Sequence, residues 1–178
     1  HLQKYRDGAI CVNFETVAEY NQDKNREIFK HSLVYIFHDV IDKNGHNGTS
    51  KEIVTNCRNA INELATMIPK IHASYNVTEV YVTSDHGFLF NDIQFAEKDK
   101  HKINEECLER STRYYLTNSE KEEPGVIKFR LDTVSGMLNA CNVTVAVPQG
   151  TNRFAAPSGG YMFTHGGAAL QEIVIPVI

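Results

Sequence analysis

Five side chains in this 178-residue sequence have the types and spacing that suit a divalent metal ion: Asp42, His46, Asp85, His86 and His165. Imidazole and carboxylate groups without thiolates form a mixed nitrogen and oxygen donor set, which favours a catalytic ion such as zinc or manganese. A structural zinc site would more often use cysteine. A glycine close to each group lets the backbone turn sharply enough for the side chains to reach one ion. The pattern therefore indicates metal-assisted chemistry.

Each of these side chains also has an ordinary structural interpretation. In a loop, Asp42 can accept hydrogen bonds from nearby backbone amides, and His46 can be a simple loop residue. Asp85 and His86 can be a turn acid and a histidine satisfied in the core, while His165 can hydrogen-bond within a glycine loop. Because short motifs are weakly specific, the five groups together carry the argument, not any one of them.

A strand and a helix are predicted around the first pair of groups. Residues 33–37 form a short apolar run rich in branched and aromatic side chains, typical of a buried strand. A polar, glycine-bearing loop begins where this strand ends. The stretch Thr49-Ser50-Lys51-Glu52 then resembles a capping box ahead of apolar residues that recur every three or four positions, which predicts a helix. Pro69 predicts that this helix kinks or stops near there.

A second apolar run at residues 77–82 leads directly into Asp85 and His86. Strand, helix and strand in this order predict a right-handed βαβ unit with parallel strands. Both polar loops would then lie at the carboxyl ends of strands, the edge where open α/β sheets bind their ligands. We therefore expect the candidate metal ligands to lie near one another.

The rest of the chain predicts shorter elements. A charged surface excursion is expected at about 91–125, with a short strand at 113–116 within it. The later elements are a strand at 126–131, a short helix at 132–140, a strand at 143–147 and a last strand at 173–178, whose Pro176 suits a sheet edge. The fold class is therefore α/β, with a mainly parallel sheet and flanking helices.

Composition excludes several classes of protein. Lys and Arg number 18 against 22 Asp and Glu, a net charge of −4, which gives no support for nucleic acid binding. Arg110, Arg113, Tyr114 and Tyr115 could stack on a base or a partner, but an exposed structural strand explains them as well. The four cysteines contain no Cys-x-x-Cys pair, which favours a reducing, intracellular setting. No apolar run approaches the roughly 20 residues of a membrane helix.

Some other polar residues are weaker candidates for the site. Arg153 could bind an anionic substrate because guanidinium pairs bidentately with phosphate, although a surface or sheet-supporting role also explains it. Thr164 and Gln171 could orient metal ligands through hydrogen bonds. His38 and Asp39 lie close enough to the first loop to replace one of its ligands.

The order of these motifs resembles the alkaline phosphatase superfamily: Asp42 through Gly48, then Ser84-Asp85-His86-Gly87, then His165-Gly166-Gly167. The final segment is more specific, because it resembles the PglZ family of bacterial phage-defence (BREX) proteins in Val147-Pro148-Gln149-Gly150, Arg153-Phe154, Gly159-Gly160-Tyr161 and Leu170-Gln171-Glu172. The resemblance runs from about Val34 to the end. It implies that 33–178 is the C-terminal part of an alkaline phosphatase-like domain, and that 1–32 is a lead-in without a diagnostic pattern.

The resemblance also implies two metal sites in the parent protein. Asp42 and His46 would share one ion with His165, while Asp85 and His86 would bind the second. Two ions about 4 Å apart can clamp the attacking and leaving oxygens of a phosphoryl transfer. The implied cofactor is a pair of divalent ions, zinc by preference and manganese as the alternative.

In the superfamily, the second ion also needs an early acid and a Ser or Thr nucleophile from a preceding strand. Neither appears before residue 33, and the first residue is His1 rather than Met. We therefore expect the nucleophile upstream of this chain, and we expect the chain alone to be inactive. An ion bound to it should prefer the side of Asp42, His46 and His165.

Two functions remain open at this stage. The first is a metal-dependent phosphatase or phosphodiesterase-type domain, acting on phosphate or sulfate esters, in a cytoplasmic BREX protein. The second is a non-catalytic scaffold that docks other defence proteins, such as the DNA methyltransferase or ATPase that the resemblance implies.

Overall fold

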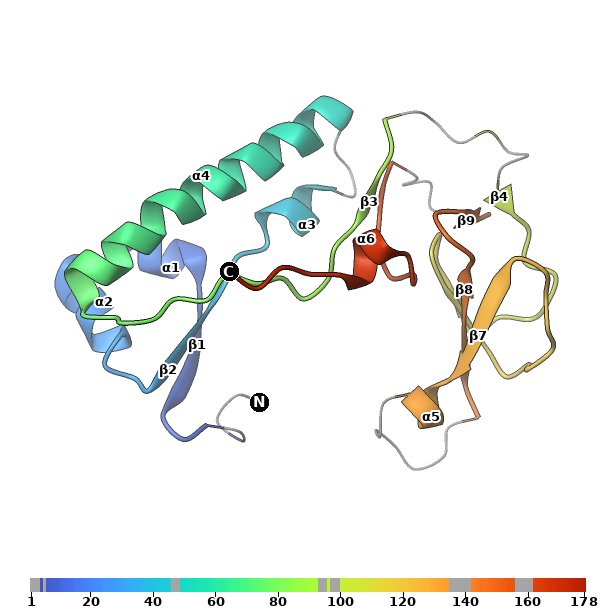
Figure 1. Ribbon diagram of the computed structural model, residues 1–178, viewed down its shortest axis with the longest axis horizontal. Coiled ribbons are helices and arrows are strands. Elements are labelled where there is room, and N and C mark those ends of the chain that lie inside the picture. The colour runs from blue at the N-terminus through green and yellow to red at the C-terminus, as the bar shows by residue number, and fades with distance from the viewer. Residues whose placement is uncertain are drawn as a thin grey trace. The chain divides into compact units, whose positions relative to one another are not determined.

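A computed structural model describes residue 4 and residues 6–45, 49–92, 96, 100–134, 142–155 and 162–178 (Figure 1). The chain divides into two compact units, His1–Tyr81 (unit 1) and Val82–Ile178 (unit 2). Each unit has its own cluster of buried apolar side chains. Throughout the described residues, no helix combines the length and apolar character needed to cross a membrane.

Unit 1 is built on a pair of parallel strands, β1 (Ala9–Asn13) and β2 (Leu33–Phe37). Two short helices, α1 (Phe14–Glu19) and α2 (Gln22–Ile28), connect these strands. The predicted strand at 33–37 is confirmed, but its predicted burial on both faces is not, because Leu33, Tyr35 and Phe37 are each 42–44% exposed. Its parallel partner, however, comes from the first 32 residues of the chain and not from 77–82.

Helix α4 (Ser50–Tyr75) is the longest element and begins as predicted. The Thr49 hydroxyl accepts from the Glu52 amide, and the Glu52 carboxylate accepts from the Thr49 amide at 2.7 Å. These hydrogen bonds with Thr49 also lower the pKa of Glu52. The helix does not stop at Pro69. Buried Met67 and Ile71 flank the proline, so packing outweighs the roughly 3 kcal/mol that an interior proline costs.

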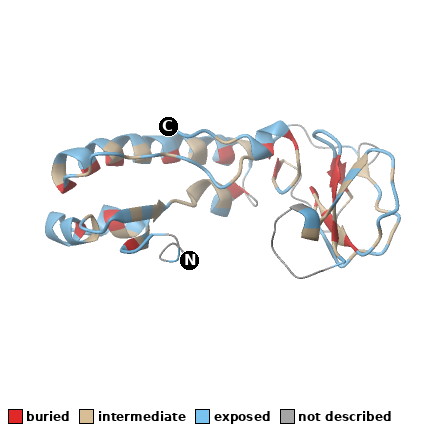
Figure 2. Ribbon diagram, turned by 60° about the horizontal axis from the view of Figure 1, so that its bottom comes forward, coloured by how far each residue is buried: buried red, intermediate tan, exposed pale blue. Residues whose placement is uncertain are grey.

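The core of unit 1 joins α1 to the second half of α4 through Phe14, Val17, Met67, Ile71 and Tyr75. Buried residues recur along α4 as the helix turns (Figure 2). The fully buried Asn25 adds a polar tie, because its side-chain amide donates to the Val17 carbonyl at 2.8 Å and the Tyr75 hydroxyl at 3.1 Å. Apolar packing thus dominates this unit.

The apolar run at 77–82 does not form the predicted strand. Val77 and Val80 instead pack against the core of unit 1, which accounts for their apolar character without a sheet. Within unit 2, Val82 exchanges two backbone hydrogen bonds with Ile178, at 2.9 and 3.0 Å. The predicted last strand at 173–178 is likewise reduced to an isolated antiparallel bridge at Val177.

Unit 2 contains a four-stranded antiparallel sheet in the order β5-β6-β8-β7, formed by Glu109–Arg110, Tyr115–Thr117, Thr144–Pro148 and Val126–Arg130. Two small strand pairs accompany it: β4 (Lys100–His101) with β9 (Arg153–Phe154), and β3 (Leu89–Phe90) with β10 (Phe163–Thr164). Helices α5 (Leu131–Val134) and α6 (Leu170–Ile173) are single turns. The predicted helix at 132–140 lies mostly outside the described residues.

The α/β class is confirmed, but the expectation of a mainly parallel sheet is not. The described strands form four small sheets, and only β1-β2 and β4-β9 are parallel. The expected surface excursion at 91–125 carries β4, β5 and β6, and within it Arg113 and Tyr115 are fully buried. Alternation in 126–131 and the apolar run at 143–147 predicted strands correctly, but neither pattern determined that these strands pair antiparallel.

Candidate metal centre

Two strands of only two residues bring the histidine-bearing segments of unit 2 together. In the antiparallel pair of β3 and β10, Leu89 lies opposite Thr164 and Phe90 lies opposite Phe163. The segment just before β3 therefore runs beside the segment just after β10. His86 lies in the first of these segments and His165 in the second.

The rings of His86 and His165 are stacked, with centroids 4.2 Å apart and an interplanar angle of 15°. Ring nitrogens of the two residues lie within 4.8 Å of each other. The His86 Nδ1 atom is 3.0 Å from the carbonyl oxygen of Gly87, which can only accept, so Nδ1 carries the proton. In the neutral ring this leaves the Nε2 lone pair of His86 available to a metal ion.

Asp85 can join His86 on one ion. Its Oδ2 atom lies 3.8 Å from His86 Nε2, whereas ligand atoms on a tetrahedral zinc ion lie about 3.3 Å apart. The Asp85 side chain is exposed, and its Oδ1 atom accepts from the His86 backbone amide at 3.0 Å. The exposed carboxylate of Asp85 therefore lies beside the His86 ring at a separation somewhat longer than that between two ligands of one zinc ion.

The other predicted ligands belong to unit 1. Asp42 was expected in a loop, but it lies in the short helix α3 (Val40–Gly45), which begins soon after β2. His46 lies outside the described residues. His38 is engaged within unit 1, because its Nε2 atom lies 2.7 Å from the Glu63 carboxylate and its ring packs edge-on against Phe14. This contact disfavours His38 as a substitute ligand.

For Asp39 and Gln171, which were considered as a substitute ligand and as a residue that orients ligands, the structure shows contacts of the backbone carbonyl oxygens. The Asp39 carbonyl accepts from the Lys43 amide at 2.9 Å at the start of α3. The Gln171 side chain is exposed, but its carbonyl oxygen lies so close to Gly87 that a Cβ atom at residue 87 would collide with it. The Thr164 hydroxyl, which was expected to orient a ligand, is buried and has no hydrogen-bond partner among the described residues.

Arg153 is buried on β9, with 1% of its surface exposed. Its guanidinium donates to the Thr151 carbonyl. Burial, together with the nearby positive charge of Arg113, lowers the pKa of Arg153 to about 10. This environment favours the sheet-supporting interpretation of Arg153 over contact with a substrate.

A buried ion pair beside the histidines was not predicted from the sequence. Arg113 donates to both carboxylate oxygens of Glu172, at 2.9 and 2.6 Å, and neither side chain is more than 1% exposed. Burial alone would raise the pKa of Glu172, but hydrogen bonds from Arg113, Ala169 and Gly167 hold it below its usual value. The partners lie 59 positions apart in the sequence, so no local pattern signalled the pair.

The chain matches a family model for an alkaline phosphatase-like domain over residues 1–178. That model describes the PglZ domain of BREX systems, and the chain belongs to this family.

Two curated relatives agree with this assignment. The chain is 30% identical over 182 residues to the alkaline phosphatase-like protein PglZ of Bacillus cereus (strain H3081.97) and 28% identical to the alkaline phosphatase-like protein BrxZ of Escherichia coli O9:H4 (strain HS). Each alignment covers 99% of this chain, but only 21% and 20% of the respective relative. The chain thus spans about a fifth of the length of these proteins.

Proposed function

We propose that this chain supplies metal ligands to a metal-dependent phosphatase or phosphodiesterase-type domain of a BREX phage-defence protein. The observation that carries the proposal is the stacked pair of His86 and His165, with Asp85 adjacent to it. A histidine that only fills the core does not require a second imidazole stacked on it with ring centroids 4.2 Å apart. Two protonated rings at this distance would repel each other. Two imidazoles beside a carboxylate supply nitrogen and oxygen donors of the kind that divalent cations bind.

The proposed assignment follows the family pattern. Asp85 and His86 hold one ion, and His165 holds a second ion together with Asp42 and His46. Zinc is the proposed metal, with manganese as the alternative. Such ions polarise a phosphoryl oxygen and stabilise the charge that develops in hydrolysis. The chain's own residues orient the ligands, because the Gly87 carbonyl fixes the His86 tautomer and the strand pair β3-β10 sets the spacing of the two rings.

The test uses the full-length protein that contains this chain. His86→Ala and His165→Ala should each lower Zn²⁺ affinity at least tenfold in calorimetric titration, and both should abolish hydrolysis of a phosphodiester such as bis(p-nitrophenyl) phosphate. His101→Asn is the matched control, because His101 is a unit 2 histidine whose Nε2 contacts Glu123 at 3.1 Å. Zinc affinity unchanged in both site variants would refute the proposal.

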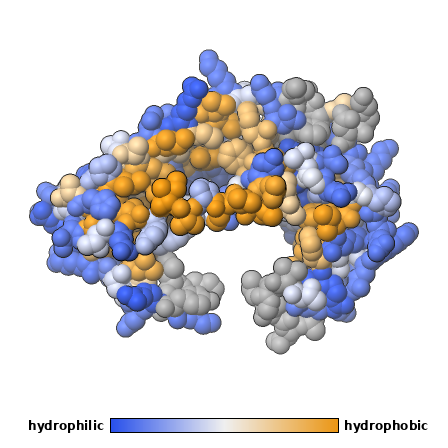
Figure 3. Space-filling view, viewed as in Figure 1, coloured by the Kyte–Doolittle hydropathy of each residue, from blue (hydrophilic) through white to orange (hydrophobic). Residues whose placement is uncertain are grey.

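Non-catalytic docking of other BREX proteins is the second candidate, and an exposed apolar face favours it. Leu33, Tyr35 and Phe37 point outward from β2, each 42–44% exposed, whereas parallel strands are usually covered on both faces. Hydrophobic side chains reach the surface in several places (Figure 3). Under this hypothesis, Tyr35→Ser would abolish co-purification with the methyltransferase or ATPase of the system, and His165→Ala would leave the biological function intact.

A further inference from the structure

The buried pair of Arg113 and Glu172 contacts both segments that carry the histidines. The Glu172 carboxylate accepts from the Gly167 and Ala169 amides, each at 3.0 Å, just after His165. The backbone carbonyl of the same Glu172 accepts from the Gly87 amide at 2.8 Å, just after His86. One residue therefore connects the two segments, by its side chain on one side and by its main chain on the other.

Two glycines show how closely the backbone approaches this pair. A Cβ atom at Gly167 would lie 2.5 Å from the Arg113 guanidinium. A Cβ atom at Gly87 would collide with the carbonyl oxygen of Gln171, the residue before Glu172. Both contacts exclude any larger residue unless the segment moves. The glycines that follow His86 and His165 thus serve close approach to the ion pair as well as turning of the chain.

Arg113 is itself held by the rest of unit 2. Besides its two bonds to Glu172, its guanidinium donates to the Gly150 carbonyl at 2.9 Å and to the Asn152 carbonyl. These carbonyls lie in the turn between β8 and β9. The side chain expected to stack on an exposed base or partner is therefore completely enclosed, and it connects the sheet of unit 2 to Glu172.

Bulk stability is a poor explanation for such an arrangement. Burying two charges costs several kcal/mol per ion, and apolar residues of similar volume often stabilise a protein equally well or better. What an apolar pair would lack is directional acceptors for the Gly167 and Ala169 amides. The directional bonds of Glu172 converge on the segments that carry the candidate ligands.

We propose that Arg113 and Glu172 are positioning residues that hold His86 and His165 at the spacing required for metal binding. The inference rests on the function proposed above. Neither residue is a proposed metal ligand. Glu172 fixes the backbone on both sides, and Arg113 keeps the Glu172 carboxylate ionised and correctly oriented.

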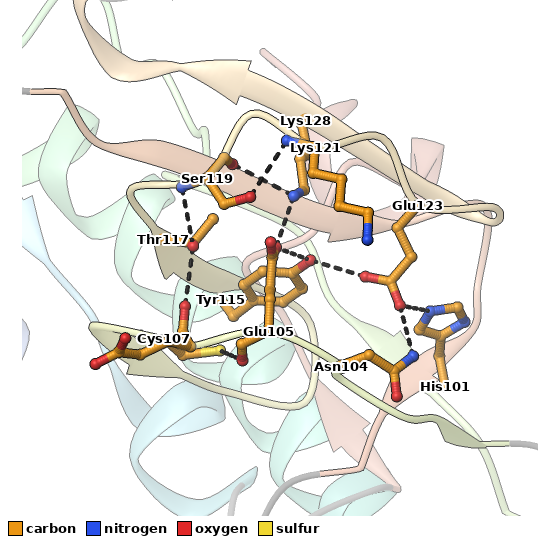
Figure 4. Close-up of polar contacts among 11 residues, drawn as sticks. His101, Asn104, Glu105, Cys107, Tyr115, Thr117, Ser119, Lys121, Glu123 and Lys128 are labelled. Carbon is orange, nitrogen blue, oxygen red and sulfur yellow. Dashed lines mark hydrogen bonds and ion pairs between the residues drawn. The ribbon is translucent and has the colours of Figure 1, made fainter.

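The experiment compares Glu172→Gln with Glu105→Gln in the full-length protein. Glu105 forms a partly buried pair with Lys128 at 2.6 Å, within a polar network that also includes Tyr115 and Glu123 (Figure 4). That network contacts neither histidine segment in the described residues, so Glu105→Gln is the matched control. Arg113→Lys is a milder variant, which keeps the charge but cannot donate in the same bidentate geometry.

Glu172→Gln should lower Zn²⁺ affinity about 10–100-fold, the usual effect of losing a partner that orients metal ligands. It should also alter the visible absorption spectrum of the Co²⁺-substituted protein, which reports coordination geometry, while Glu105→Gln leaves both measurements unchanged. Arg113→Lys should fall between them. Wild-type affinity and a wild-type Co²⁺ spectrum in folded Glu172→Gln or Arg113→Lys would overturn the inference.

A measurement on the metal-free protein separates this inference from the proposed function. Hydrogen exchange followed by mass spectrometry should show faster exchange in peptides covering 84–90 and 163–172 in Glu172→Gln, but not in Glu105→Gln. If the histidine variants leave metal binding unchanged while this exchange pattern is seen, the metal function fails and the pair still positions the histidines. If exchange is unchanged in both segments, the positioning role is refuted whatever the protein binds.

Discussion

The two units of this chain are stabilised by different kinds of interaction. In unit 1, α4 packs apolar side chains against α1 and its neighbours, with Asn25 as the buried polar exception. In unit 2, the apolar cluster of Tyr115, Ala146 and Phe154 is smaller, and a buried ion pair lies beside the candidate site. Apolar packing is non-directional and tolerates change, whereas an ion pair with shared amides fixes particular atoms. The directional interactions occur beside the proposed metal ligands.

The largest expected loss of stability comes from breaking that pair. Glu172→Ala leaves the Arg113 charge buried without its carboxylate, which should cost about 3–5 kcal/mol in the free energy of unfolding. Urea denaturation monitored by hydrogen exchange in unit 2 measures the effect. A cost below about 1 kcal/mol would mean that water or another acceptor replaces Glu172, and the contrast between the units would fail.

A cavity created in the core of unit 1 should lower the free energy of unfolding slightly less than Glu172→Ala does. Ile71→Ala removes a side chain that is 3% exposed in the core, for an expected loss of about 3 kcal/mol. Ile61→Ala on the same helix is the control, since Ile61 is 64% exposed and its loss should stay within about 0.5 kcal/mol. Equal effects of the two substitutions in thermal or urea unfolding would contradict the assigned core of α4.

Gly87→Ala tests the close approach in unit 2. The added methyl group forces the backbone away from Gln171, at an expected cost of about 1–3 kcal/mol, and it should weaken zinc binding as the His86 segment shifts. Gly125→Ala provides the comparison, because its φ of +78° makes alanine strained there while the nearest atom is 3.8 Å away. Calorimetry should show normal zinc affinity in Gly125→Ala and reduced affinity in Gly87→Ala.

Removing the N-terminal cap of α4 should lower the free energy of unfolding by a smaller amount. Thr49→Ala removes the hydroxyl that accepts from the Glu52 amide, for a loss of about 1 kcal/mol. The control is Thr55→Ala, which removes a hydroxyl that donates to the Lys51 carbonyl one turn earlier. This substitution should leave the free energy of unfolding nearly unchanged. Thermal unfolding distinguishes the two variants, and a neutral Thr49→Ala would show that packing alone sets the start of the helix.

Acid should affect unit 2 before unit 1. The pKa of Glu172 is lowered in the folded state, so its contribution is fully present above the unfolded value of about 4.3 and is lost as pH falls through the lower folded value. Arg113 and Arg153 are the charges that face it. Hydrogen exchange at pH 3–5 should show unit 2 opening first, and Glu172→Gln should remove part of this pH dependence.

Local patterns predicted the parts of the fold that local interactions form. The capping box of Thr49 and Glu52 and the three-to-four periodicity behind it correctly located α4, and apolar runs located β2 and β8. The run at 77–82 was misassigned because packing of Val77 and Val80 on a helical core leaves the same apolar signal as a buried strand. Asp42 was placed in a loop because α3, a helix of six residues, is too short to show periodicity.

The types of residue in the candidate site were predicted from the sequence, but the strands that bring these residues together were not. Asp85, His86 and His165 stood out because acid, imidazole and glycine are neighbours in the sequence. Their proximity depends on β3 and β10, which at two residues each are too short to alternate detectably. Glu172 could have been suspected, because an acid in an otherwise apolar final segment needs a partner, but only the tertiary fold identifies that partner as Arg113.

The hydrogen bonds that Glu172 accepts from the two histidine segments differ in how they depend on the identity of the residue. The carbonyl that receives the Gly87 amide exists whatever amino acid the codon specifies, whereas the carboxylate that receives the Gly167 and Ala169 amides is lost with almost any missense change. A substitution at residue 172 would therefore remove the acceptor for the His165 segment and leave the acceptor for the His86 segment in place.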